Sequence, residues 1–200
     1  MENKDFFEVV KNRRTIYNIS KDIKVSDSRI QEIVEFAIKN APSSFNSQAG
    51  RAVILLKDES DKFWASTTEI LRAIVPADKF APTEAKMKGF GAGYGTILFF
   101  EDQVPVKKMQ EAFPSYAHNF PVWSEHSSGM VQFIVWAALE AEGLGCSLQH
   151  YAPLVDEAVQ KNWGVPKEWK LIAQMPFGQP TAAPGEKTFQ PIEDRVKVFK

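Results

Sequence analysis

Two neighbouring arginines near the amino terminus are the residues best suited to bind an anion. Arg13 and Arg14 are followed directly by Thr15, and Tyr17 lies two positions further along. Two guanidinium groups and a hydroxyl supply a fork of hydrogen-bond donors that suits a phosphate group. A solvated basic turn is the alternative interpretation of the same cluster.

A polar loop and one tail cation carry further hydrogen-bonding groups. The loop at residues 42–48 contains Ser43, Ser44, Asn46 and Gln48, whose hydroxyl and amide groups both donate and accept. Lys187 is an isolated cation in an extended segment near the carboxyl end. Taken singly, the loop also fits an ordinary polar connection, and the lysine also fits an ordinary surface residue.

Several familiar catalytic patterns are missing from the chain. It has no Gly-x-Ser-x-Gly nucleophile elbow. Cys146 and His150 stand four positions apart in a segment expected to be extended, which separates their side chains too far for a nucleophilic pair. His118 and His126 are too distant in sequence to be a helical pair of metal ligands. The sequence therefore predicts neither a nucleophilic pair nor a metal site.

A glycine-rich run at residues 89–95 differs from a dinucleotide-binding loop in two ways. Tyr94 stands where the third glycine of Gly-x-Gly-x-x-Gly is required. The run also precedes an expected strand, whereas a phosphate-binding loop follows a strand and opens a helix. We therefore expect a flexible turn into the strand at residues 96–100.

The spacing of apolar residues predicts helices intermixed with about four strands. Ser26 is a good N-cap for one helix, and Pro42 marks its end. Helical stretches are expected at residues 5–11, 26–41, 62–75, 82–88, 107–113, 127–142 and 153–163, and strands or extended segments at residues 51–57, 96–100, 146–151 and 169–175. The connections show no regular strand–helix–strand period, which favours an α+β fold with helices on both faces of the sheet.

The stretch at residues 127–142 is the best helix of the chain. Its expected apolar face consists of Met130, Phe133, Ile134, Ala137, Ala138 and Ala141, widened by Val131, Val135 and Leu139. A helix that is apolar over so much of its circumference is buried in the centre of the protein or in a subunit interface.

Length and composition restrict the class of protein. The chain has 200 residues, 44% of them hydrophobic, a net charge of −1 and one cysteine. These values predict a single domain over residues 1–200 without a disulfide framework, and a near-neutral charge does not favour nucleic-acid binding. We see no signal peptide and no run long enough to span a membrane, so we expect a protein of a reducing compartment, the cytoplasm.

Taken together, the motifs resemble the FMN-dependent nitroreductase family. They are Arg-Arg-Thr-x-Tyr from Arg13, Pro-Ser-Ser-x-Asn-x-Gln from Pro42, Gly-Leu-Gly-Cys from Gly143 and Pro-Gly-Glu-Lys from Pro184. The segments at residues 94–102, 147–151 and 175–178 are similar to the short branch of that family, which is named for fatty-acid repression. The resemblance covers nearly the whole chain, and its specificity comes from the order and spacing of the motifs.

The resemblance implies a three-layer sandwich with a central, mostly antiparallel sheet, assembled as an intertwined homodimer. It implies two FMN sites at the subunit interface, and a tail at residues 176–200 that packs on the partner subunit. By position, Arg13, Arg14 and Thr15 match the family's phosphate and ribityl contacts, and Lys187 matches its tail cation. The other cofactor-binding residues implied are Tyr17, the partner's loop residues Ser43, Ser44, Asn46 and Gln48, and the ring-side residues Leu148, Gln149 and His150.

Two positions depart from the larger members of the family. Tyr17 stands where they carry a basic residue near the pyrimidine edge of the flavin, and Phe189 stands where they carry a second tail arginine. Without a cation near that edge, the flavin is expected to be harder to reduce, unless a group such as Arg72 substitutes. Loss of one phosphate cation is expected to weaken FMN retention.

The function implied is an NAD(P)H-dependent FMN oxidoreductase that reduces small nitroaromatic or quinone-type acceptors by a ping-pong, two-electron mechanism. The cofactor carries the difficult chemistry in such an enzyme, so no catalytic acid or nucleophile is named. An alternative is a regulatory or ligand-binding module of a lipid or stress response, with weak or lost flavin. A purely structural dimerisation protein is a third interpretation.

Overall fold

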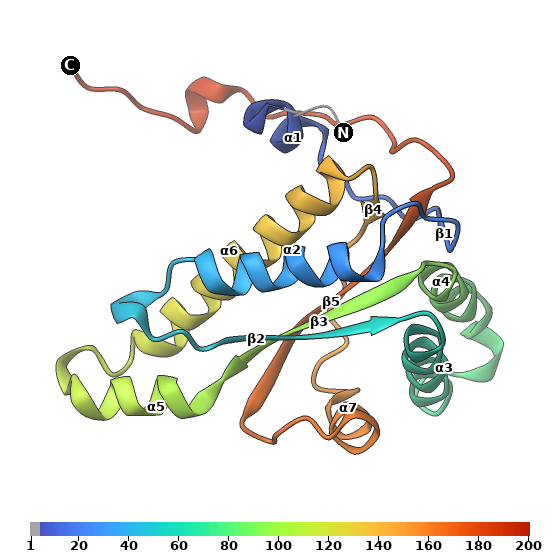
Figure 1. Ribbon diagram of the computed structural model, residues 1–200, viewed down its shortest axis with the longest axis horizontal. Coiled ribbons are helices and arrows are strands. Elements are labelled where there is room, and N and C mark those ends of the chain that lie inside the picture. Colours follow the sequence, from blue (N-terminus) through green and yellow to red (C-terminus); the bar gives the residue numbers. More distant parts are fainter. Residues whose placement is uncertain (1–4) are drawn as a thin grey trace.

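The computed structural model describes residues 5–200, which form one body of helices and strands (Figure 1). Its α-helices are α1 (Phe6–Asn12), α2 (Asp27–Asn40), α3 (Asp58–Arg72), α4 (Ala81–Gly91), α5 (Gln103–Ala112), α6 (Phe120–Ala141) and α7 (Asp156–Trp163). Its strands are β1 (Ile19–Ser20), β2 (Gly50–Leu56), β3 (Gly95–Asp102), β4 (Gly145–Cys146) and β5 (Trp169–Pro180). Four short 3-10 turns complete it: η1 (Ser44–Asn46), η2 (Ala77–Lys79), η3 (Pro114–Tyr116) and η4 (Ile192–Asp194).

The five strands form one antiparallel sheet. Their order is β1-β5-β3-β2, and β4 pairs with β5 at Phe177 and Gly178. In the central pairs Val53 of β2 lies opposite Leu98 of β3, and Leu98 lies opposite Gln174 of β5; the register of β3 with β5 shifts between Phe99 and Phe100. The expected α+β class with a mostly antiparallel sheet is confirmed.

Strand β3 lies at the centre of three layers. Ile97 and Phe99 point into a core shared with α2 and α6, whereas Leu98 and Phe100 point into a second core with α3, α4 and α7. Both faces of β3 are therefore buried, which explains why its sequence is a continuous apolar run rather than an alternating one. Figure 1 shows the two groups of helices on opposite faces of the sheet.

Helix α2 begins and ends as the sequence predicts. The Ser26 hydroxyl accepts a hydrogen bond from the Arg29 N–H at 3.2 Å, which satisfies one of the free N–H groups of the first turn. Ile30, Ile33 and Ala37 then face the core. Pro42 follows the end of the helix at Asn40.

Helix α6 differs from the expectation in both its start and its buried face. It begins at Phe120, seven residues before the expected start, and it packs on the sheet through Val131, Val135 and Leu139. Met130 and Phe133, assigned to the main apolar face, remain 37% and 38% exposed. The buried side of α6 is therefore formed by the residues expected only to widen the apolar face, and part of the predicted apolar face remains exposed to solvent.

Other boundaries also differ from the sequence predictions. Gly89 and Gly91 lie inside α4, so the expected glycine-rich turn contracts to residues 92–94. Helix α7 begins at Asp156 rather than at Pro153. Strand β5 continues to Pro180, so the extended tail starts at residue 181 rather than 176. The tail is exposed throughout, and its first residues, 181–184, line a cavity together with Asn12 at the end of α1.

No helix among residues 5–200 is long and apolar enough to cross a membrane.

Candidate functional site

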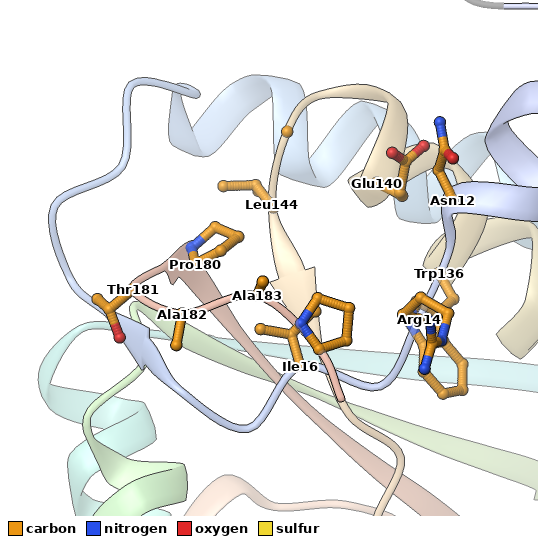
Figure 2. A pocket seen from close by; sticks show the side chains of 12 residues that line it. Asn12, Arg14, Ile16, Trp136, Glu140, Leu144, Pro180, Thr181, Ala182 and Ala183 are labelled. Atoms are coloured by element: carbon orange, nitrogen blue, oxygen red, sulfur yellow. The ribbon is translucent and has the colours of Figure 1, made fainter. Parts of the chain in front are cut away.

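Two adjoining cavities lie where the tail passes over the segment that follows α1. We call them together the tail cleft. The first, of about 450 Å³, lies beside the end of α6 and is drawn in Figure 2. The second, of about 350 Å³, lies between residues 13–18 and residues 182–187. The cleft thus joins residues from both ends of the chain.

The segment after α1 is fixed to the sheet through β4. The Ile16 N–H donates to the Cys146 carbonyl at 3.0 Å, and Thr15 forms a parallel bridge with Cys146. Side chains of such an extended segment alternate in direction. Accordingly, Arg14 and Ile16 line both cavities, whereas Arg13, Thr15 and Tyr17 line the second cavity alone.

The three predicted cations of the cleft have different surroundings. The Arg13 guanidinium lies 4.4 Å from the centroid of the Trp136 ring, a cation–π contact that orients it. The Arg14 guanidinium donates a hydrogen bond to the Gly185 carbonyl at 2.6 Å, and this contact ties the tail to the segment after α1. Lys187 lines the second cavity with Arg13, and its ammonium lies 5.0 Å from the Phe189 ring.

Tyr17 lies at the exposed rim of the second cavity. Its side chain is largely exposed, and its ring centroid is 6.3 Å from that of Phe90 on α4. Arg72, suggested as a substitute cation, donates to Glu84 at 2.8 Å and lies over the Phe80 ring at 4.3 Å. It lines neither cavity of the tail cleft, so the suggested substitution has no support in the described chain.

The polar loop is well ordered by its own contacts. The Ser43 hydroxyl accepts from the Gln48 N–H at 3.0 Å, and the Gln48 carbonyl accepts from the Arg51 guanidinium at 2.7 Å. Its backbone enters the left-handed region three times, at Phe45 (φ 54°), Asn46 (φ 53°) and Gln48 (φ 49°). None of these residues is glycine, so the conformation is uncommon and is held by the surrounding contacts.

The loop and the arginines lie at opposite ends of α6 in one chain. Phe45 contacts the ring of Trp123 near the start of the helix, whereas Arg13 contacts Trp136 near its end. Thirteen residues of α-helix separate those two tryptophans by about 20 Å. A single chain therefore does not bring Ser43, Ser44, Asn46 and Gln48 to the tail cleft.

The predicted ring-side segment follows β4 directly. Gln149 exchanges two backbone hydrogen bonds with Gln174 of β5, at 2.7 and 2.9 Å, and its side-chain amide donates to the Ser147 hydroxyl at 3.0 Å. Leu148 packs against the core shared with α2 and α6, while His150 is exposed. The segment is thus anchored on the same strand pair that holds Thr15.

Burial makes Cys146 an unreactive thiol. Its side chain lies in the core, and burial raises the pKa of the thiol far above its ordinary value. His150 is exposed, so the two residues do not form a nucleophilic pair. Among residues 5–200, no group of three His, Cys, Asp or Glu side chains is arranged to hold a metal ion.

Two residues near the site were missed by sequence reasoning. Trp136, which orients Arg13, belongs to the apolar helix and carries no motif that would have marked it. Gln174 is fully buried; its side-chain carbonyl accepts from the Tyr151 N–H at 2.7 Å, and no described residue accepts from its amide nitrogen. A polar residue inside an apolar strand was the one available signal.

A second buried polar group, the carboxyl of Glu101, lies near the end of β3. The Ser124 hydroxyl donates to one oxygen of Glu101, and the other oxygen has no partner among the described residues. Burial raises the pKa of this carboxyl to about 7, although Ser124 and the charge of Arg51 both act to lower it.

Comparison with known proteins gives a consistent set of matches. The model of the nitroreductase family matches residues 10–179. The putative nitroreductase HBN1 of Saccharomyces cerevisiae is 38% identical over 189 residues, which cover 94% of this chain and 93% of that protein.

Solved structures extend these matches to the fold. Structures of the nitroreductase CinD from Lactococcus lactis, in complex with nicotinic acid and with 4-nitrophenol, are 46% identical and superpose with TM-scores of 0.91 and 0.89. They cover 98% of this chain and 100% of theirs. A protein from Exiguobacterium sibiricum, described as a putative nitroreductase in complex with FMN, shares the fold at 18% identity, a TM-score of 0.70 and at least 99% coverage of each chain.

Proposed function

Because this chain belongs to the nitroreductase family, we propose that it is an FMN-dependent oxidoreductase that uses NAD(P)H to reduce small, flat, electron-poor acceptors. The single observation that carries the proposal is the meeting of Arg13 and Lys187 in the second cavity of the tail cleft. The two cations come from opposite ends of the chain, and neither forms an ion pair with a carboxylate of residues 5–200.

The residues of the cleft fit the phosphate end of FMN. Arg13, Thr15 and Lys187 place two cations and a hydroxyl around one cavity, which is the donor set that a phosphate dianion requires. Glu186 also lines this cavity and is the unfavourable charge there. Arg14 holds the tail in place through its hydrogen bond to Gly185. We therefore propose that Arg14 positions the tail, in addition to making the phosphate contact implied by the family.

FMN supplies reversible two-electron chemistry, and the protein binds and orients the reactants around it. In the balanced reaction, NAD(P)H, one proton and the acceptor are converted to NAD(P)⁺ and the two-electron-reduced acceptor. A nitro group would become a nitroso group and water, and a quinone would become a hydroquinone. We propose that reductant and acceptor use the same exposed face in turn, which gives ping-pong kinetics. The nicotinic acid and 4-nitrophenol in the CinD structures support small planar rings as occupants.

We also propose that two copies of the chain form each complete site. Ser43, Ser44, Asn46 and Gln48 lie at the far end of α6 from the tail cleft, so a second copy is needed to bring that loop to the cofactor. The exposed Met130 and Phe133 of α6 offer an apolar surface for it. In the same assembly the tail at residues 181–200 packs on the partner.

The first experiment measures FMN binding to a double variant. Arg13→Ala with Lys187→Ala removes two charge-assisted contacts, which should raise the dissociation constant of FMN roughly a hundredfold. Lys24→Ala with Lys39→Ala removes the same charge from exposed positions and is the matched control. Fluorescence titration of the apoprotein with FMN gives both constants.

The outcomes separate the proposed function from its alternatives. Yellow wild-type protein that NAD(P)H bleaches without oxygen supports the oxidoreductase. Colourless protein that takes up no FMN supports a regulatory or ligand-binding module instead. Equal FMN affinity of both double variants would overturn the assignment of the tail cleft.

A further inference from the structure

An aromatic cluster packs around Phe45 of the polar loop and is not used by the cofactor contacts proposed above. We call it the aromatic platform; its members are Phe45, Phe113, Tyr116, Phe120 and Trp123. The Phe45 ring centroid lies 4.7 Å from that of Phe113 and 5.6 Å from that of Phe120. Tyr116 and Trp123 extend the platform, with centroids 6.1 Å apart.

The platform has a buried base and an exposed top. Phe120 is 3% exposed, whereas Phe45 is 54%, Tyr116 49% and Phe113 37% exposed. Exposed large apolar side chains that are grouped, rather than scattered singly, mark a binding surface. Phe45, Phe113 and Tyr116 therefore contact neighbouring rings and still keep part of their surface accessible.

The backbone at Phe45 indicates that the position of this ring matters. Phe45 adopts φ 54°, a conformation that aromatic residues rarely adopt. Such strain persists when surrounding contacts hold it, and here the Ser43–Gln48 hydrogen bond closes the loop while Phe113 and Phe120 hold the ring. The loop therefore presents a preformed aromatic surface.

We propose that the aromatic platform is the surface that selects flat aromatic acceptors, and that Phe45 is its specificity-determining residue. This inference rests on the proposed function, in which the loop reaches the tail cleft of a second copy. Phe45 stands between Ser44 and Asn46, so a loop that brings those two residues to the cofactor brings the Phe45 ring there too. An electron-poor planar ring stacks on a phenyl face, whereas a non-planar hydrated anion gains nothing from it.

The test compares two acceptors with flavin-loaded, full-length protein. The protein is reduced with dithionite, which bypasses NAD(P)H, and its reoxidation by 1,4-naphthoquinone or by ferricyanide is followed in a stopped-flow instrument without oxygen. Phe45→Ala should slow the reaction with the quinone about three- to tenfold, the value of one aromatic contact. The reaction with ferricyanide should be unchanged.

Binding and rescue provide readouts that do not depend on turnover. The dissociation constant of 4-nitrophenol for the oxidised protein, measured by calorimetry, should rise by the same factor in Phe45→Ala. Phe45→Leu keeps apolar volume without a flat face and should behave like Phe45→Ala, whereas Phe45→Trp should restore binding. Phe36→Ala removes an exposed phenylalanine of α2, outside the platform, and is the matched control.

The possible results separate this inference from the proposed function. A selective loss with the aromatic acceptor supports the platform. Equal behaviour of the Phe45 and Phe36 variants, with normal FMN content, would overturn this inference and leave the proposed function standing. A wild-type protein that binds no FMN would overturn both. A Phe45→Leu variant that holds FMN normally excludes simple collapse of the loop as the cause of any loss.

Discussion

Glu101 is a buried carboxyl whose protonation is linked to the stability of the fold. Burial favours its neutral form and raises its pKa to about 7, above the ordinary value of 4.5. The folded state therefore binds more protons than the unfolded state between these two values. The contribution of Glu101 to the free energy of unfolding is then largest at low pH and falls as pH rises from about 4.5 to about 7.

Glu101→Gln should remove this dependence, because an amide does not titrate. The free energy of unfolding of the variant, relative to wild type, should rise by on the order of 3 kcal/mol between about pH 5 and about pH 8. Denaturant unfolding of FMN-saturated protein at the two pH values measures the difference. Glu111→Gln removes an exposed carboxyl of α5 and serves as the control. A parallel pH dependence of wild type and Glu101→Gln would contradict the assignment.

The elements of the core were largely predictable because their signals are local. Ser26 and Pro42 bound α2, and the branched apolar runs mark β2 and β3. These features depend on capping chemistry and on side-chain spacing within one element. In contrast, Arg13 and Thr15 are far from Lys187 in the sequence. That these residues would lie around one site was implied only by the resemblance to a family.

The remaining features depend on tertiary contacts that no local pattern encodes. The open face of α6, with Phe133 partly exposed, depends on which side of an almost uniformly apolar helix meets the sheet. Strand β1 has two residues and exists because Ile19 and Ser20 pair with the end of β5. The cation–π contact of Arg13 with Trp136 likewise joins two distant segments. Such features are consequences of packing.

The seam between β4 and the segment after α1 sets the position of the cations. A Cβ atom on Gly145 would lie 2.8 Å from Ile16 Cγ2, closer than real contacts allow, and 3.1 Å from Pro180 Cγ, which is a tight contact. Gly145→Ala should therefore displace Ile16 and weaken FMN binding roughly tenfold or more, because Arg13 and Thr15 move with it. Fluorescence titration with FMN measures the change.

A matched glycine distinguishes displacement from a general effect of added volume. Gly89 lies in α4 with open space around its position, so Gly89→Ala should keep FMN affinity and stabilise the helix by about 0.5–1 kcal/mol. If Gly145→Ala bound FMN as tightly as Gly89→Ala, the seam would not be what positions the cations.

In a single copy, the two halves of the proposed site lie at opposite ends of α6. The tail cleft adjoins the end of α6, and the polar loop adjoins its start. Between them α6 leaves Met130 and Phe133 open. A two-fold axis near the middle of this helix would bring each loop to the opposite cleft and would cover those side chains in one step.

Phe133→Glu should therefore break the proposed dimer. A carboxylate buried without a partner in an apolar interface costs several kcal/mol, so the dimer dissociation constant should rise by about a hundredfold or more. Sedimentation at graded concentrations measures the dissociation constant, and a parallel FMN titration should show affinity falling as monomer accumulates, because each site would lose the partner's loop. Ile74→Glu is the matched control. It introduces the same charge at an exposed residue just after α3, a helix that covers the opposite face of the sheet. This variant should keep the dimer dissociation constant of the wild type. Dimers of equal strength in both variants would place the interface elsewhere, and full FMN affinity in a Phe133→Glu monomer would mean that one chain binds the cofactor without the loop of a second.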